Sequence, residues 1–108
     1  MSQNLITVSD LKEMMDKHED FILLDVREEN ERDIAKINYN CRHIPMEDVT
    51  TRYEELQKDK NIVIYCHSGV RSFQVCRLLE MYGFARVRSL VGGIDAWAQE
   101  IDPTIKRY

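Results

Sequence analysis

Residues 61–72 read NIVIYCHSGVRS and place a cysteine directly behind an apolar run. Ile62–Tyr65 is typical of a strand that is buried on both faces, because its apolar side chains follow one another without alternation. The residues after the loop predict a helix over Ser72–Tyr82, which has its apolar side chains on one stripe and ends at Gly83. A strand, a tight loop around Cys66 and a helix form the repeating unit of an α/β domain.

Further strand-like and helix-like segments alternate along the rest of the chain. The other predicted strands are Leu5–Val8, Phe21–Val26 and Arg86–Val91, together with the brief extended segment Cys41–Pro45. The other predicted helices are Asp10–Lys17 with Ser9 as N-cap, Glu47–Lys58 and Ile94–Gln99, and the charged run Glu28–Asp33 is interpreted as a solvated face. This alternation predicts an α/β domain with a mostly parallel sheet.

Composition restricts the size, the compartment and the partners of the protein. The 108 residues, of which 44% are hydrophobic and 31% charged, predict one domain with its core over about residues 5–100 and a short tail from Pro103. A net charge of −4 argues against nucleic acid and anionic membranes as main partners. The sequence shows no secretory signal pattern and no apolar run of about 18 residues, so we expect a cytoplasmic protein.

Cysteine and histidine spacing argues against disulfides and metal sites. The three cysteines are Cys41, Cys66 and Cys76. Their number is odd, no CxxC pair occurs, and the three histidines lack the spacing of helical metal ligands. We therefore expect free thiols, no metal and no cofactor. Cys76 lies on an apolar helix stripe and is predicted to be a core thiol, while a part for Cys41 as a second reactive thiol stays open.

The loop behind Ile62–Tyr65 has the composition of an anion-binding site. Ligands of parallel sheets bind beyond the carboxyl ends of the strands, which is where Cys66 lies. N–H groups of a tight loop and of the following helix end would surround its sulfur, while Gly69 permits the turn and Arg71 adds a cation. These groups favour a thiolate, so we predict that Cys66 is a reactive nucleophile rather than a small core residue.

The spacing between Cys66 and Arg71 indicates what the loop holds. Cysteine phosphatases use a similar loop with one residue more between cysteine and arginine, because their loop must encircle the oxygens of a phosphoryl group. Only four residues separate Cys66 from Arg71 here. The smaller ring is suited to one extra sulfur atom on the cysteine.

Three motifs together resemble those of the single-domain rhodaneses, the thiosulfate sulfurtransferases. They are Leu23–Glu28 (LLDVRE), Tyr65–Ser72 (YCHSGVRS) and Leu90–Trp97 (LVGGIDAW). The resemblance extends from about Ile6 to Trp97, and it departs from the family where residues 35–45 read AKINYNCRHIP without the usual glycines. It implies a central, mostly parallel five-stranded sheet flanked by helices on both faces.

The resemblance also implies covalent catalysis with two displacements. The Cys66 thiolate would take the outer sulfur of thiosulfate or a related donor as a persulfide, and pass it to cyanide or a thiol with ping-pong kinetics. The substrate- and persulfide-binding loop would comprise His67, Ser68, Gly69, Val70, Arg71 and Ser72. Its N–H groups would stabilise the persulfide, Arg71 would attract the anionic donor, and Ser72 would either bond the sulfur or cap the helix.

Neighbouring residues, and the loop itself, admit other roles. Asp25 and Arg27 could supply an acid and a donor to the site, although a buried structural ion pair is the favoured interpretation. His67 could form a dyad with Cys66, but adjacent residues in a tight loop tend to point apart, so we expect it to face solvent or substrate. The same loop could serve a non-enzymatic module that relays persulfide from a partner protein or senses oxidants, or, less in keeping with its length, a phosphatase of the same fold.

Overall fold

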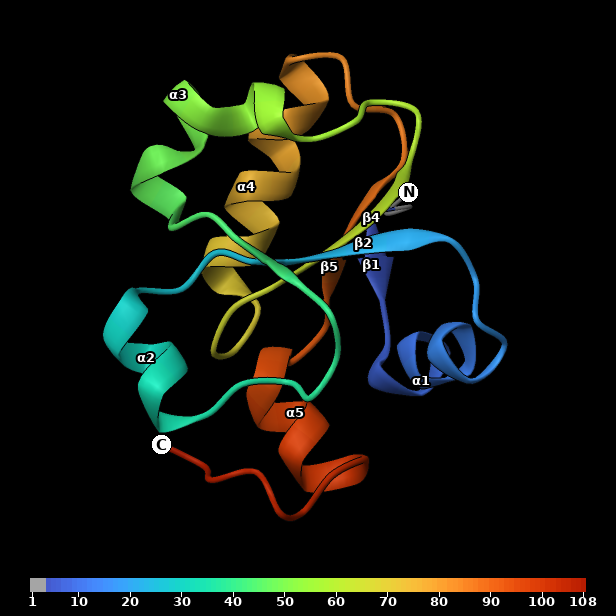
Figure 1. Ribbon diagram of the computed structural model, residues 1–108, viewed down its shortest axis with the longest axis vertical. Coiled ribbons are helices and arrows are strands. Elements are labelled where there is room, and N and C mark those ends of the chain that lie inside the picture. Colours follow the sequence, from blue (N-terminus) through green and yellow to red (C-terminus); the bar gives the residue numbers. More distant parts are fainter. Residues whose placement is uncertain (1–3) are drawn as a thin grey trace.

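Five parallel strands form one sheet in the computed structural model, which describes residues 4–108 (Figure 1). The strands are β1 (Leu5–Ile6), β2 (Phe21–Asp25), β3 (Arg42–His43), β4 (Asn61–Tyr65) and β5 (Val87–Leu90). Their order across the sheet is β1-β5-β4-β2-β3, and every pair is parallel, so the predicted sheet is confirmed. The two apolar strands β2 and β4 pair along their full length.

Helices cover both faces of this sheet, as predicted. The helical segments are α1 (Val8–Asp16), α2 (Glu29–Ile34), the 3-10 turn Met46–Asp48, α3 (Val49–Arg52), the 3-10 turn Tyr53–Glu55, α4 (Val70–Met81) and α5 (Gly93–Glu100). Figure 1 shows α3 and α4 on one face and α1 and α5 on the other, with α2 beyond the carboxyl end of β2. Over residues 4–108, no helix has the length and the apolar content needed to cross a membrane.

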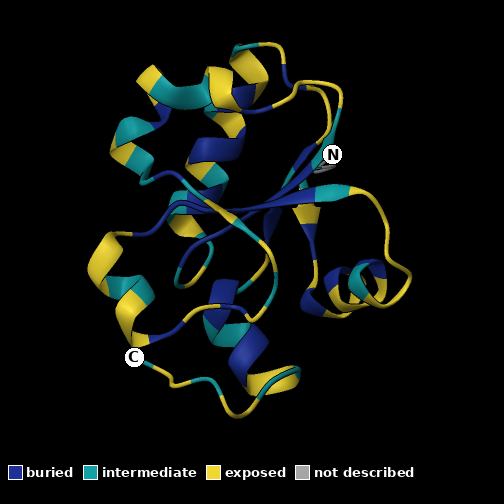
Figure 2. Cartoon of the chain, in the orientation of Figure 1, coloured by how far each residue is buried: buried dark blue, intermediate teal, exposed yellow. Residues whose placement is uncertain are grey.

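The core has two halves, one on each face of the sheet. The strand side chains that pack with α3 and α4 are Ile22, Leu24, Ile62 and Ile64, and those that pack with α1 and α5 are Leu23, Val63 and Tyr65. All of them are buried, and the central strands are accordingly dark in Figure 2. Both faces of β2 and β4 need apolar side chains, which explains why the two strands read as continuous apolar runs.

Two helices begin two residues earlier than predicted, because their capping residues differ. Thr7, not Ser9, is the N-cap of α1, and its side chain accepts the N–H of Asp10 at 3.1 Å. α4 begins at Val70 rather than Ser72, because its N-cap is Gly69 with a φ of 108°. Such a left-handed angle favours glycine. The positive end of α4 therefore lies closer to Cys66 along the chain than the sequence predicted.

The predicted helix over Glu47–Lys58 is wrong in its continuity and length. Residues 46–55 form two 3-10 turns around the four-residue α3, and Leu56 is extended. The extended backbone lets Leu56 turn into the core ahead of β4. The other predicted strands and helices are present, with ends that differ by one or two residues.

Replacement of Leu79 by alanine is expected to lower the free energy of unfolding by about 2–5 kcal/mol, because this fully buried side chain fills the space between α4 and the sheet. Met81→Ala in the same helix is the matched control. Its side chain is 80% exposed, so its removal should change stability by less than about 0.5 kcal/mol. Urea denaturation measures both, and equal costs would contradict the packing described here.

Candidate active site

Backbone amides converge on the sulfur of Cys66. This residue directly follows β4, and its Sγ accepts the N–H of Gly69 at 3.1 Å and that of Ser72 at 3.3 Å. The second amide belongs to the first turn of α4, where N–H groups have no partner within the helix. Two hydrogen-bond donors and the positive end of a helix therefore meet at Sγ, and both favour negative charge there.

Ser72 connects the sulfur to the sheet. Its hydroxyl lies 3.5 Å from Sγ of Cys66, donates to the carbonyl of Gly69 at 3.2 Å and shares a 2.7 Å hydrogen bond with Ser89 of β5. Of the two roles predicted for Ser72, the helix cap is wrong, since Gly69 occupies that position. Cys66 is 1% exposed, so its sulfur lies inside the loop, while Ser68 and Val70 are exposed at the rim.

The first amides of α5 hold the loop from the other side. Ile94 donates its N–H to the carbonyl of Cys66 at 2.9 Å, and Asp95 donates to that of His67 at 3.1 Å. The close approach requires Gly93, because a Cβ on this residue would collide with both carbonyl oxygens. Gly93 also has a φ of 59°, in the left-handed region. The second glycine of LVGGIDAW thus serves the loop around Cys66, although it lies more than twenty residues further along the chain.

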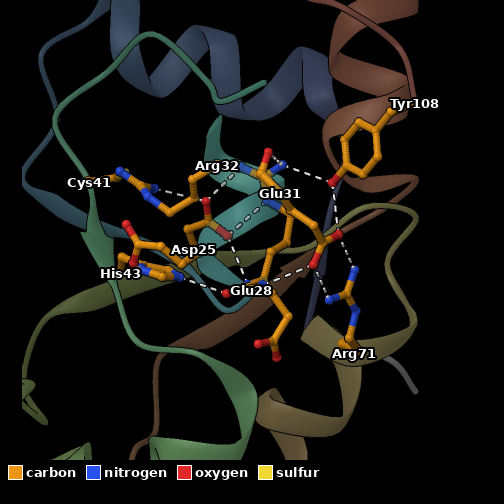
Figure 3. Close-up of polar contacts among 10 residues, drawn as sticks. Asp25, Glu28, Glu31, Arg32, Cys41, His43, Arg71 and Tyr108 are labelled. Carbon is orange, nitrogen blue, oxygen red and sulfur yellow. Dashed lines mark hydrogen bonds and ion pairs between the residues drawn. The ribbon is translucent and has the colours of Figure 1, made fainter. Parts of the chain in front are cut away.

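Arg71 lies in an ion pair with Glu31 of α2 (Figure 3). The guanidinium donates to the two carboxylate oxygens at 2.7 and 2.9 Å. Hydrogen bonds from Arg71 hold the pKa of Glu31 at about 2. Sequence reasoning missed Glu31, because it belongs to the charged run that was interpreted as a solvated face. That interpretation is wrong for Glu31 and for Arg32, which are both partly buried.

Asp25 and Arg27 form the buried ion pair that the sequence favoured over a catalytic role (Figure 3 labels Asp25). Both side chains are fully buried. Arg27 donates from Nε at 3.0 Å and from Nη2 at 2.8 Å, and Arg32 adds a third side-chain hydrogen bond to the same carboxylate at 2.9 Å. Burial alone would raise the pKa of Asp25, but the hydrogen bonds from Arg27 outweigh it and hold this pKa below its usual range. The bond from Arg32 connects α2 to the end of β2.

The C-terminal segment returns to the loop, which no signal in the sequence indicated. The ring of Tyr108 stacks on the ring of His67, with 4.1 Å between centroids and 11° between planes. Its hydroxyl accepts from Arg27 at 2.8 Å and donates to Glu31 at 3.0 Å. Arg107 pairs with Asp95 of α5 at 2.8 Å. His67 therefore packs against the end of the chain, and its ring is half-buried rather than free in solvent.

The other two cysteines have different surroundings. Cys76 is fully buried in α4, and burial raises the pKa of its thiol to about 12, as fits a core residue. Cys41 is partly exposed just ahead of β3, and its sulfur accepts a 3.5 Å hydrogen bond from Arg32. Arg32 links Cys41 to Asp25, so Cys41 lies at the end of the polar cluster opposite to Arg71 (Figure 3).

Comparison with known proteins finds a family and several relatives. The family model of the rhodanese-like domain matches residues 7–100. A sulfurtransferase of Allochromatium vinosum is 37% identical, with 94% of each chain covered, and the putative sulfurtransferase YtwF of Bacillus subtilis is 40% identical over 91% of this chain and 93% of its own length. Among solved structures, a rhodanese-related protein of Thermoplasma volcanium has a TM-score of 0.82 at 28% identity, with 97% of this chain and 99% of that chain covered.

Gly93→Ala is expected to disrupt the loop around Cys66, because the added Cβ would meet the carbonyl oxygens of Cys66 and His67. Gly83→Ala is the control, since Gly83 also has a positive φ, of 96°, but its Cβ would meet only the flexible end of Lys58. We expect the Gly93 variant to be less stable than the control by at least about 2 kcal/mol. Alkylation of Cys66 by iodoacetamide, mapped by peptide mass, should also slow at least about tenfold. Equal behaviour of the two variants would refute the anchoring role of α5.

Arg27→Met is expected to cost about 3–5 kcal/mol, because it leaves the Asp25 carboxylate buried with a single cation. Arg52→Met, which removes an exposed pair with Glu55, should cost no more than about 1 kcal/mol. The lowered pKa of Asp25 stabilises the fold above about pH 4, and this stabilisation is lost as the pH falls further. Denaturation at several pH values should thus show the cost of Arg27→Met shrinking in acid, and a cost independent of pH would count against the pair.

Proposed function

This chain belongs to the rhodanese-like domain family, as its three motifs predicted, and on that basis we propose that it transfers sulfane sulfur through a persulfide on Cys66. The observation that carries the proposal is the convergence of the Gly69 and Ser72 amides on Sγ. The relatives named above support sulfur transfer in general. The persulfide and the sequence of steps are our inference from the geometry.

The first step loads Cys66 with sulfur. The thiolate attacks the outer sulfur of thiosulfate, a new S–S bond forms, and the old S–S bond breaks with its electron pair on the departing sulfite. The product is a persulfide anion on Cys66. The added sulfur is bonded to Sγ, the atom that the Gly69 and Ser72 amides contact in the free protein, so these amides are placed to share its negative charge. The Ser72 hydroxyl oxygen lies 3.5 Å from Sγ and accepts from the thiol in the free protein.

The second step returns the enzyme to its initial state. Cyanide or a thiolate attacks the outer sulfur of the persulfide, and the Cys66 thiolate leaves. Charge and atoms balance in both steps without a metal or a cofactor, and the two displacements give ping-pong kinetics. Because each cycle begins from a reduced thiol, the proposal includes a reducing compartment such as the cytoplasm.

The size of the loop supports sulfur rather than phosphate as the transferred group. Four residues separate Cys66 from Arg71, and Sγ is almost inaccessible to solvent. A single sulfur atom needs less room than a tetrahedral phosphoryl group. Asp25 and Arg27 have a structural part in this proposal, because their charges are satisfied by one another and by Arg32.

A relay of persulfide between proteins is the second candidate function. It uses the same Cys66 persulfide, and Val70, 65% exposed beside the loop, offers an apolar contact for a partner protein. A relay module would load slowly from free thiosulfate and rapidly from a persulfidated partner protein. Comparison of the two loading rates distinguishes the candidates.

Incubation with thiosulfate is expected to add one sulfur atom to the protein, because the persulfide is a stable intermediate until an acceptor arrives. Intact mass spectrometry measures the gain, and thiocyanate formation after addition of cyanide measures turnover. Cys66→Ser should lose both signals, whereas Cys41→Ser should keep them. Sulfur uptake that persists in Cys66→Ser would overturn the proposal.

A further inference from the structure

The cation predicted to attract the donor is already paired within the protein. Arg71 presents its two terminal nitrogens to the two oxygens of Glu31, at 2.7 and 2.9 Å (Figure 3). This fork-to-fork geometry is the strongest form of an arginine–carboxylate contact. The side chains of Arg71 and Glu31 are 30% and 15% exposed, so solvent screens the pair only in part. The loop therefore presents a compensated charge rather than a free cation.

Glu31 is held in this position by two further contacts. One carboxylate oxygen accepts the N–H of Glu28 at 2.9 Å, which forms part of the capping box of α2. The other oxygen accepts the hydroxyl of Tyr108 at 3.0 Å. With its pKa held at about 2, the carboxylate keeps its charge at neutral pH. Glu31 is thus a fixed negative charge next to the loop, with partners from three segments of the chain.

The pairing of Arg71 with Glu31 affects anions of different charge to different extents. The interaction of an anion with a nearby charge scales with the charge of the anion, so a dianion loses more from the compensation of Arg71 than a monoanion does. We propose that Glu31 is a specificity-determining residue, which disfavours dianionic donors such as thiosulfate and favours sulfane donors with at most one negative charge. The inference rests on the proposed function, because it concerns the donor that loads Cys66.

The test compares two donors that differ by one charge. Thiosulfate is a dianion, and methanethiosulfonate carries a methyl group in place of one charged oxygen. Each passes its outer sulfur to the Cys66 thiolate, and the electrons of the broken S–S bond leave with sulfite or methanesulfinate. The quantity measured is the ratio of the two loading rate constants, thiosulfate over methanethiosulfonate. Taking the ratio within each variant cancels any general loss of reactivity.

Glu31→Gln is expected to raise this ratio about five- to tenfold, because it removes the charge and keeps an oxygen for Arg71. Asp33→Asn removes an equal charge from an exposed position of the same helix and should leave the ratio unchanged. Tyr108→Phe removes a hydrogen bond from Glu31 but not its charge, and should also leave the ratio unchanged. An unchanged or lower ratio in Glu31→Gln, or an equal rise in Asp33→Asn, would overturn the inference.

If Glu31→Gln does not fold, a measurement on the unmodified chain still tests the inference. With Arg71 compensated, the loading rate with thiosulfate should not fall as salt is raised from about 0.01 to 0.5 M, whereas a free cation would give a steep fall. A steep fall would overturn the inference. Failure of both donors to load Cys66 would overturn the proposed function, and this inference with it. If both donors load Cys66 but the ratio of rate constants or the salt dependence differs from the expected result, only the inference about Glu31 is overturned.

Discussion

The anchoring of two loop carbonyls by the start of α5 is the contact on which the site depends. A peptide unit is planar, so fixing the C=O groups of Cys66 and His67 also fixes the directions of the N–H groups that follow them. The chain must then turn sharply at Gly69, whose left-handed backbone leads into α4. The outcome is a loop that keeps its carbonyls away from the sulfur and brings the Gly69 and Ser72 amides toward it. The geometry around Sγ is a consequence of backbone direction more than of side-chain chemistry.

A second layer of ionic contacts fixes the elements around the loop. Asp25 is the centre of this layer, since it accepts hydrogen bonds from both Arg27 and Arg32. Arg27 continues to Tyr108, and Tyr108 to Glu31, which in turn holds Arg71 at the beginning of α4. Charges alternate in sign along the cluster, so each charged group in it has a partner of opposite charge (Figure 3). Such a cluster gives specificity of arrangement, because every member is costly to leave unpaired.

The two layers have different consequences for chemistry. The Gly69 and Ser72 amides contact Sγ of Cys66 directly, and these contacts involve no atom of a donor. The ionic layer acts at the edge of the site and determines the charge that an arriving donor meets. The two layers therefore act at different places, the amides at Sγ and the ionic contacts around Arg71.

The sequence by itself determined the helices and strands whose formation depends on residues close by in the chain. Continuous apolar runs predicted β2 and β4, and the residues CHSGVR predicted a turn with a nucleophile before a helix, because periodicity and glycine act within a few residues. The N-cap of α1 was predicted wrongly, since Thr7 and Ser9 have similar side chains and either can cap a helix. The tertiary structure alone decided the partners of Arg71 and His67. Glu31 lies 40 residues from Arg71, and Tyr108 lies 77 residues from Glu31. Their contact therefore depends on the tertiary arrangement of segments that are far apart in the sequence. Charged side chains have many possible partners in a sequence with 31% charged residues, and only three-dimensional proximity selects among them.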